Sequence, residues 1–273
     1  MNVLSLFDGI SCGRVALERV GIVIDKYFAS ETNDLAISVS KKNYNDIIHI
    51  GDVRDIYTDT FNKIDLLIGG SPCQSFSSAG SMSGMTTTQH IDILTLEQYL
   101  ELKENGFEFD GYSYLFWEYV RILKELKPMY FLLENVRMAH KWKNIITNAL
   151  SVEPILINSE LVSAQSRPRL YWTNIPGVAQ PIDKHIFIDD IIEKDISHTY
   201  LKRTRLDYSN YNKSKVDKTT HKNTAIQIGN SRKFTNAVKS NGKAFTLRRI
   251  NPNGILDKDY NIRLFTPIEN TTR

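Results

Sequence analysis

Apolar runs typical of buried strands alternate with amphipathic segments along the first 175 of the 273 residues. The clearest amphipathic segment predicts a helix over 113–128, where Pro128 blocks its continuation. A second helix is expected over 32–43, with Thr32 or Asn33 as its N-cap. Strands are expected at seven apolar runs, namely 3–7, 22–30, 47–50, 65–70, 129–135, 154–161 and 169–174. This alternation predicts an α/β fold, in which right-handed crossovers build a mainly parallel sheet with helices on both faces.

Polar residues follow the ends of these runs, and ligands of such sheets bind beyond the carboxyl ends of the strands. The first run leads into a glycine-containing turn at 7–13, whose backbone N–H groups can hold a carboxylate or a phosphate. Glu31 follows the second run, where an acid usually binds ribose hydroxyls. Asp52 and Val53 follow the third, where a carboxylate can accept from an adenine amino group. Each feature alone is typical of an ordinary turn or helix cap, but together they favour a cofactor that carries a nucleoside.

A cysteine and a glutamate stand at the ends of two further runs. Cys73 lies on a stiff Gly-Gly-Ser-Pro-Cys turn at the mouth of the expected sheet, which suits a nucleophile, although a free cysteine is more often a small buried hydrophobe. Glu134 follows an apolar run, and its half-desolvated carboxylate suits holding or delivering a proton; a cap or an ion pair is the alternative. Arg167 and Arg169 flank Pro168, so both are expected to point to one face, towards an anion or a polar ligand.

Composition narrows the classes of protein to which the chain can belong. Apolar residues make up 41% of the chain and charged residues 24%, which is an ordinary globular balance. Cys12 and Cys73 are the only cysteines, so a disulfide framework is excluded and a reducing compartment is expected. The six histidines show no ligand spacing, and neither a metal site, a signal peptide nor a membrane span is expected.

The basic residues are concentrated at the carboxyl-terminal end of the sequence. Residues 201–273 hold 16 Lys and Arg against 5 Asp and Glu, a net charge of +11, whereas residues 1–200 carry −8. Such an appendage is typical of polyanion binding, and a solvated basic tail is the alternative. The turn-forming sequence at 177–181 marks the expected boundary, which gives a first domain over 1–177 and a second over 178–273.

Four motifs follow one another in an informative order: SLFDGISCG, GGSPCQSFS, LLENV and QSRPRLYW. In this order and spacing the chain resembles the DNA cytosine-5 methyltransferases, and the form SLFDGI is most similar to the animal de novo enzymes and to phage and bacterial relatives. The resemblance covers nearly the whole chain, up to RLFTPIE at 263–269. It implies a Rossmann-like S-adenosylmethionine-dependent methyltransferase fold with a smaller basic target-recognition domain.

The resemblance implies a catalytic role for each of five residues. Cytosine C5 is a weak nucleophile, and the family activates it by adding a thiolate to C6, a role that falls to Cys73. Glu134 would bind N3 and the exocyclic amine of the base, and Asn135 would hold the local backbone. Arg169, helped by Arg167, would stabilise charge on the O2 side of the ring.

The resemblance also implies S-adenosylmethionine as methyl donor, with S-adenosylhomocysteine as product and no metal. Phe7 would pack on the adenine, the backbone of 8–11 would hold the methionine end, and Glu31 would bind the ribose. Thr32 stands where relatives often have a larger residue, so stacking on that side is expected to be weaker. The residues implied to bind the cofactor are Phe7, Asp8, Gly9, Ile10, Ser11, Glu31, Thr32, Asp52, Val53, Gly70, Pro72 and Leu115.

Double-stranded DNA is the implied substrate. The target cytosine must be flipped out of the duplex, and the polar loop at 78–89 is expected to close behind it. The basic segment from about residue 178 to 260 would contact phosphates, with some side chains reading base edges. RNA methylation and a catalytically silent DNA-binding homologue are the alternatives. A cytoplasmic location, associated with the nucleoid in a bacterial or phage setting, is expected.

One departure from the family concerns the end of the sequence. Relatives continue beyond the Arg-x-x-Thr-Pro-x-Glu motif into a Gly-Asn-containing motif whose helix closes the cofactor pocket. Here the sequence ends at Arg273, and the Gly-Asn pair at 229–230 precedes Thr266 and Pro267, which is the wrong order. A second polypeptide that supplies this motif, a truncated chain and a degenerate remnant are the three explanations.

Overall fold

The computed structural model describes residues 1–76 and 84–191, together with the backbone of four short strands between residues 224 and 264. The chain divides into two compact units. The first comprises Met1–Leu156 and Arg169–Ala179, and the second comprises Ile157–Pro168 and Gln180–Arg273. The domain boundary between residues 177 and 178 stays a prediction. So does the role of residues 178–273 in target recognition.

A seven-stranded sheet organises the first unit, in the order β3-β2-β1-β4-β5-β7-β6. Strands β3, β2, β1, β4 and β5 pair in parallel, whereas β7 is antiparallel to β5. The mainly parallel α/β sheet predicted from the sequence is therefore confirmed. The strands are β1 (Asn2–Leu6), β2 (Lys26–Ser30), β3 (Ile47–Gly51), β4 (Leu66–Gly69), β5 (Tyr130–Val136), β6 (Ile155–Asn158) and β7 (Pro168–Thr173).

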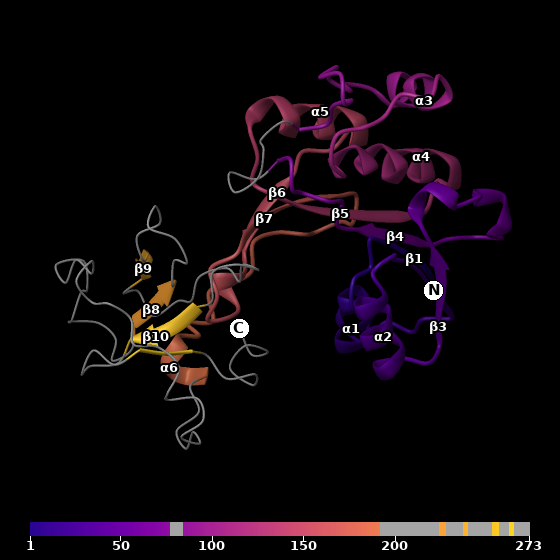
Figure 1. Cartoon of the computed structure of the whole chain (residues 1–273). Helices are drawn as coiled ribbons and strands as arrows, with labels where there is room; N and C mark the ends of the chain where they lie inside the picture. The colour runs from indigo at the N-terminus through magenta and orange to yellow at the C-terminus, as the bar shows by residue number, and fades with distance from the viewer. Residues whose placement is uncertain (77–83, 192–223, 228–236, 240–252, 257–261, 265–273) are drawn as a thin grey trace. The chain divides into compact units, whose positions relative to one another are not determined.

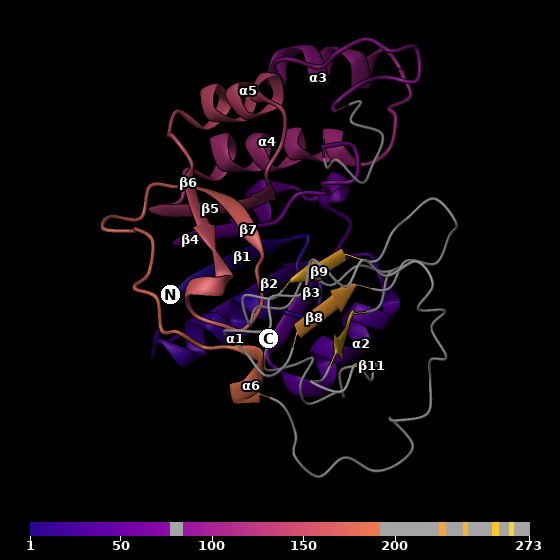
Figure 2. The same cartoon turned by 90° about the vertical axis from the view of Figure 1, so that its left-hand side faces the viewer.

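Helices cover both faces of this sheet. Helices α3, α4 and α5 lie on one face, and α1 and α2 lie on the other (Figures 1 and 2). Successive side chains of β1 point to opposite faces of the sheet, so the strand contributes to a hydrophobic core on each face. Leu4 belongs to the larger cluster, which includes residues of α4, and neighbouring Val3 belongs to a smaller cluster with Tyr27. The helices are α1 (Cys12–Arg19), α2 (Asp34–Asn43), α3 (Leu96–Glu104), α4 (Phe116–Leu126) and α5 (His140–Leu150), with short 3-10 helices η1 (Val53–Asp55), η2 (Thr58–Thr60) and η3 (Ser113–Leu115).

The ends of two helices and one strand refine the sequence predictions. Asn33 is the N-cap of α2, since its Oδ1 accepts from two N–H groups of the first turn, and Thr32 is not. Helix α4 ends at Leu126, and the left-handed residue Lys127 stands between it and Pro128. The run expected to begin at residue 22 forms a strand only from Lys26.

Strand β5 ends one residue later than the strand expected over 129–135. It runs over Tyr130–Val136 and includes Glu134 and Asn135. The reason is its antiparallel partner β7, in which Leu170 pairs with Asn135 and Arg169 pairs with Val136. Helices α3 and α5 were not predicted at all.

The second unit contains a four-stranded antiparallel sheet in the order β11-β10-β8-β9. Its RLFTPIE motif begins in β11, and residues 265–269 lie outside the described residues. In the part of the chain that the structure describes, no helix is both long and apolar enough to cross a membrane. The elements are β8 (Thr224–Gln227), β9 (Ala237–Lys239), β10 (Asn253–Leu256), β11 (Ile262–Leu264), the short helix α6 (Ile188–Ile191) and the 3-10 helix η4 (Ser159–Leu161).

Candidate active site

The turn that follows β1 has an unusual backbone. Phe7, Gly9 and Ser11 have positive φ angles of 57°, 61° and 65°. Left-handed backbone is unfavourable for residues other than glycine, so surrounding contacts have to hold this turn in place. Two backbone hydrogen bonds contribute, from the N–H of Asp8 to the carbonyl of Ser30 and from the N–H of Ser11 to the carbonyl of Asp8. Backbone hydrogen bonds therefore hold the turn both where it leaves β1 and where it enters α1.

Glu31 lies directly after β2 and faces this turn. Its carboxylate accepts hydrogen bonds of 2.8 Å from the backbone N–H groups of Gly9, Thr32 and Asn33. The bond from Gly9 links the carboxyl ends of β1 and β2, which are neighbours in the sheet. The structure thus brings Glu31 and Thr32 together with the glycine turn, and Thr32 contributes its backbone.

Asp52 directly follows β3 and forms the cap of η1. Its Oδ1 accepts from the backbone N–H of Arg54 at 2.9 Å, so the ordinary capping role is realised. The guanidinium of Arg54 also contacts the carboxylate, with Nη2 2.5 Å from Oδ2. This hydrogen bonding lowers the pKa of Asp52. Neighbouring Val53 is buried, so the predicted pair at this strand end presents one charged and one apolar side chain.

Cys73 lies on the turn shortly after β4, and two buried side chains hold this turn. Asn135 on β5 donates through its amide to Ser71, at 2.9 Å from Oγ and 3.2 Å from the carbonyl oxygen. On the other side of the cysteine, the N–H of Ser75 donates to the hydroxyl of Ser113 at 3.2 Å. Asn135 and Ser113 are almost completely buried, whereas Cys73 is partly exposed. The thiol therefore sits on a turn that is anchored on both sides.

Glu134 and Arg169 form an ion pair across β5 and β7. Arg169 Nε lies 2.7 Å from Glu134 Oε1, and the exposed fractions of the two side chains are 13% and 31%. The other carboxylate oxygen lies against Gly70, because a Cβ built on this glycine would be 3.1 Å from Glu134 Oε2. Gly70 begins the turn that carries Cys73. Gly70, Glu134 and Arg169, all predicted from the sequence, therefore meet at the same end of the sheet, and part of the Glu134 carboxylate remains accessible.

The remaining predicted residues occupy varied positions. Leu115 is buried in η3, Pro72 is half-buried, and Ile10 is exposed on the turn after β1. Arg167 is exposed in the second unit, where its N–H donates to Asn158 at 2.7 Å, and its expected position beside Arg169 stays a prediction. Of the loop at 78–89, residues 78–83 lie outside the described part of the chain.

Three residues of these clusters were missed by the sequence reasoning. Arg54 follows Asp52 by two positions, which is a signal for a local ion pair. Ser71 stands inside the Gly-Gly-Ser-Pro-Cys motif and could have been noticed as a hydrogen-bonding group next to Cys73. Ser113 lies 38 residues from its partner Ser75, and nothing in the local sequence predicts the contact.

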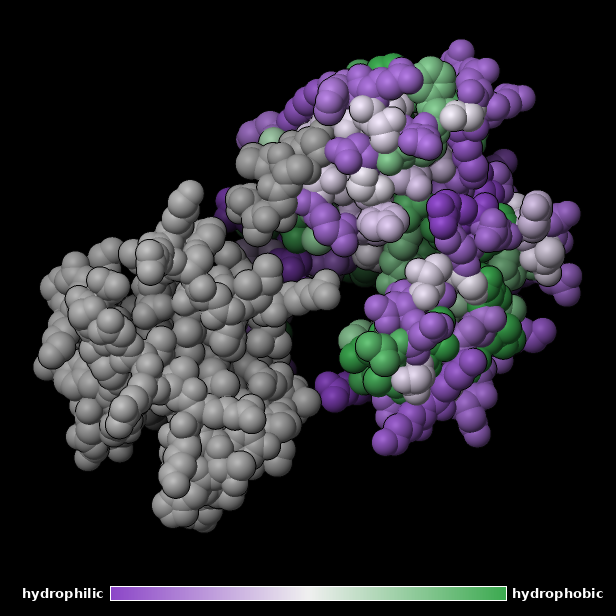
Figure 3. All heavy atoms as spheres, in the orientation of Figure 1, coloured by the Kyte–Doolittle hydropathy of each residue, from purple (hydrophilic) through white to green (hydrophobic). Residues whose placement is uncertain are grey.

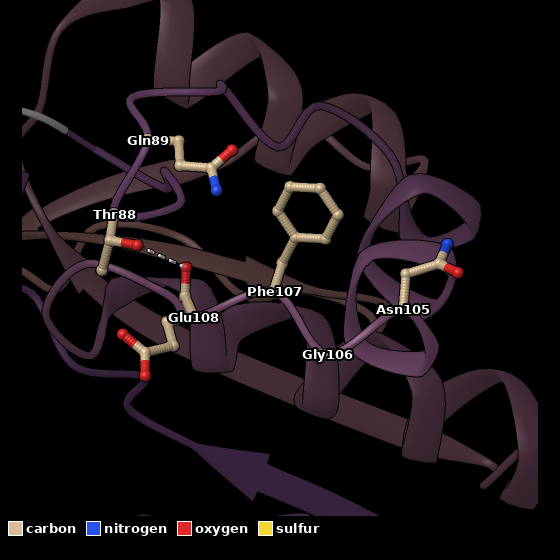
Figure 4. Close-up of a pocket in the computed structure, with 6 residues that line it drawn as sticks. All are labelled: Thr88, Gln89, Asn105, Gly106, Phe107 and Glu108. Atoms are coloured by element: carbon tan, nitrogen blue, oxygen red, sulfur yellow. Dashed lines mark hydrogen bonds between the residues drawn. The ribbon is translucent and has the colours of Figure 1, made fainter.

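A pocket of about 320 Å³ is lined by none of the residues predicted to bind the cofactor or to act on the base. It is formed by Thr88 and Gln89, at the end of the predicted loop, and by residues 105–108 after α3, as Figure 4 shows. Thr88 donates there to the carbonyl of Glu108. Its lining contains Glu108 as the only charged side chain among the described residues and no nucleophilic cysteine or histidine. This pocket therefore does not extend the candidate site.

Comparison with known proteins places these features in a family. The family model for C-5 cytosine-specific DNA methylase matches residues 1–272. The chain is 30% identical over 198 residues to the orphan methyltransferase M.SPRI of Bacillus phage SPR, covering 68% of this chain and 39% of that protein. It is 34% identical over 137 residues to the type II methyltransferase M.FnuDI of Fusobacterium nucleatum, covering 50% of this chain and 33% of that protein. The match therefore spans well under half the length of each of these relatives.

A solved structure agrees on the fold. The structure of S. pombe Dnmt2 methyltransferase superposes with a TM-score of 0.53 at 20% sequence identity, covering 80% of this chain and 68% of that one. This identity supports the Rossmann-like methyltransferase fold alone. The family match over almost the entire sequence confirms the resemblance based on the four motifs. This chain therefore belongs to the C-5 cytosine-specific DNA methylase family.

Proposed function

We propose that this chain transfers a methyl group from S-adenosylmethionine to C5 of a cytosine flipped out of duplex DNA. The observation that carries the proposal is the link between the Cys73 turn and the Glu134–Arg169 pair. Asn135 joins the turn to β5, and the adjacent residue Glu134 is the paired carboxylate. A partly exposed thiol after β4 and an oriented carboxylate–guanidinium pair on β5 and β7 thus lie at the same end of the sheet, as covalent activation of a pyrimidine requires.

Each residue then has a defined part in the reaction. The Cys73 thiolate adds to C6, and the displaced electron pair makes C5 nucleophilic. Glu134, in its protonated form, donates to N3 while its other oxygen accepts from the exocyclic amine, and transfer of this proton to N3 offsets the negative charge that builds on the ring. Arg169 keeps the Glu134 carboxylate oriented and, with Arg167, faces the O2 side of the base. After methyl transfer a base removes the C5 proton, the C6–S bond breaks, and the thiolate of Cys73 is restored.

S-adenosylmethionine supplies the methyl group as a sulfonium electrophile, and the residues after β1, β2 and β3 suit its three parts. A Cβ on Gly9 would meet nothing within 4 Å, so the turn is open towards a ligand. Helix α1 has no side-chain N-cap, which leaves its amino-terminal end suited to the methionine carboxylate. Glu31 would bind the ribose, and Asp52 and Val53 would bind the adenine edge, with Phe7 on the adenine face and Gly70, Pro72 and Leu115 completing the wall.

The proposed partners of the chain are inferred from its basic segment and from the apolar side chains exposed on its first unit. The basic segment within 178–273 is proposed to contact the phosphates of duplex DNA. On the first unit, Val20, Val23 and Leu35 are 71%, 77% and 78% exposed. Figure 3 shows hydrophobic residues at several places on the surface of this unit. A second polypeptide is proposed as a further partner of the chain, since exposed apolar side chains favour packing against another protein.

The test measures transfer of tritiated methyl groups to mixed-sequence duplex DNA, with transfer RNA as the competing acceptor. Incorporation into DNA that is lost in Cys73→Ser supports the proposal. Incorporation into RNA alone would show that the substrate class is wrong. DNA binding without incorporation into either acceptor, even after addition of the polypeptide encoded downstream, would identify a catalytically silent homologue.

A further inference from the structure

The carboxylate of Asp8, inside the turn after β1, is held by two hydroxyl groups. Tyr27 on β2 donates to Oδ1 at 2.7 Å, and Ser11 donates to Oδ2 at 2.5 Å. Tyr27 is 1% exposed and Ser11 is fully buried. Both oxygens of the carboxylate are therefore engaged by side chains from inside the protein. Burial, together with the nearby Asp8 charge, raises the pKa of Tyr27.

The chain of hydrogen bonds continues from Ser11 to α2 and β3. The hydroxyl of Ser11 lies 2.6 Å from that of Ser40, which in turn lies 3.4 Å from Nε2 of His49. Ser40 is the single buried residue of α2, so this helix uses its one interior position for a polar contact. We call the series Tyr27, Asp8, Ser11, Ser40 and His49 the Asp8 network.

The Asp8 network leaves the first turn of α1 without a side-chain cap. Ser11 is the residue before the helix, yet it is left-handed and its hydroxyl does not cap the first turn. Instead that hydroxyl is turned towards Asp8 and Ser40. Gly13 permits this arrangement, because a Cβ there would lie 2.9 Å from the hydroxyl of Tyr27 and 2.3 Å from Ile68 Cδ1. Serine is otherwise a preferred N-cap, so its diversion keeps the amino-terminal N–H groups of α1 from being capped by a side chain.

We propose that Tyr27 and Ser40 are positioning residues for the carboxylate of the methyl donor. By holding Asp8 and Ser11, they keep the turn left-handed and leave the start of α1 to a ligand carboxylate. Neither residue touches the donor. The inference rests on the proposed function, since it assigns a further task at the same cofactor site.

The test compares two ligands by titration calorimetry with the full chain. S-adenosylhomocysteine carries the amino-acid carboxylate, and 5′-methylthioadenosine lacks it. Tyr27→Phe and Ser40→Ala are each expected to weaken binding of S-adenosylhomocysteine about tenfold, as loss of one hydrogen bond to a charged group allows. Binding of 5′-methylthioadenosine should not change. A merely structural role would weaken both ligands alike.

Matched controls remove comparable hydroxyls outside the Asp8 network. Tyr44→Phe removes a hydrogen bond to Glu18, and Ser38→Ala removes one to the carbonyl of Leu35; both are expected to bind like the wild type. Unchanged binding in Tyr27→Phe and Ser40→Ala, or equal loss for the two ligands, would overturn the inference alone. Ser40→Ala decides the matter if Tyr27→Phe fails to fold. A wild-type chain that binds neither ligand would overturn the proposed function and the inference together.

Discussion

Replacing Asn135 by alanine removes the side chain that anchors the Cys73 turn to β5. Asn135 is 1% exposed and donates twice to Ser71, whose hydroxyl is itself buried. Each lost hydrogen bond costs about 1 kcal/mol, and a buried acceptor left unpaired costs roughly 1–3 kcal/mol more. The variant should therefore lose about 3–5 kcal/mol of unfolding free energy, so a domain within most of the usual range of about 5–15 kcal/mol stays folded. A displacement of the thiol by about 1 Å would lower the catalytic rate roughly a hundredfold.

The assay separates these two effects. Methyl transfer at saturating S-adenosylmethionine gives kcat, and urea unfolding gives the stability. Saturation keeps any change in cofactor affinity, through Gly70 and Pro72 on the same turn, out of the measured kcat. Asn174→Ala is the matched control, since Asn174 also makes two backbone hydrogen bonds next to β5, to Phe131 and Met129. The control should lose stability but keep its kcat. A folded Asn135→Ala with wild-type kcat would refute the positioning of Cys73 through Asn135.

Further predictions concern stability. Glu118 is fully buried and accepts from Tyr99, Lys103 and Arg121 at 2.6–2.7 Å. Glu118→Ala should therefore lower the unfolding free energy, measured in urea, by about 3–5 kcal/mol. The half-exposed control Glu125→Ala should lower it by less than about 1 kcal/mol, and equal losses would refute the prediction. Burial, with a contribution from Lys41, lowers the pKa of His49 against a smaller opposing effect of Asp8. The unfolded chain then binds more protons below about pH 6.5, so unfolding free energy should fall as the pH drops from there towards the folded pKa. His49→Gln should reduce that slope, and a slope like that of the wild type would contradict this reasoning. Gly84→Ala should destabilise strongly, because φ is +79° and the added Cβ would lie 1.9 Å from the Trp142 ring; a melting temperature like that of the wild type would contradict this packing.

Local pattern was sufficient to predict most of the strands and the acids at their ends. Glu31 and Asp52 were predicted because each directly follows an apolar run, and both lie directly after a strand. Helix α3 was missed although Thr95 caps it and accepts from Gln98, a Thr-x-x-Gln signature that the sequence displays. Helix α5 gave no such signal, since Ala139 precedes it without a side-chain cap.

Contacts between distant segments could not be predicted from the sequence. The bond between Tyr27 and Asp8 depends on the register of β1 against β2, and Ser113 reaches Ser75 only because η3 packs under the Cys73 turn. The partnership of Glu134 with Arg169 depends on β7 running antiparallel beside β5, which the apolar runs of the two strands do not reveal. Tertiary pairing, not local propensity, decided each of these positions.

Covalent trapping tests the central claim most directly. Duplex DNA containing 5-fluorocytosine blocks the last step, because fluorine cannot leave C5 as a proton does, and the thiol adduct then accumulates. Incubation with S-adenosylmethionine followed by peptide mass spectrometry should locate the adduct on Cys73, with full trapping retained in Cys12→Ser and none in Cys73→Ser. An adduct on another residue, or methyl transfer in Cys73→Ser at the wild-type rate, would contradict the account.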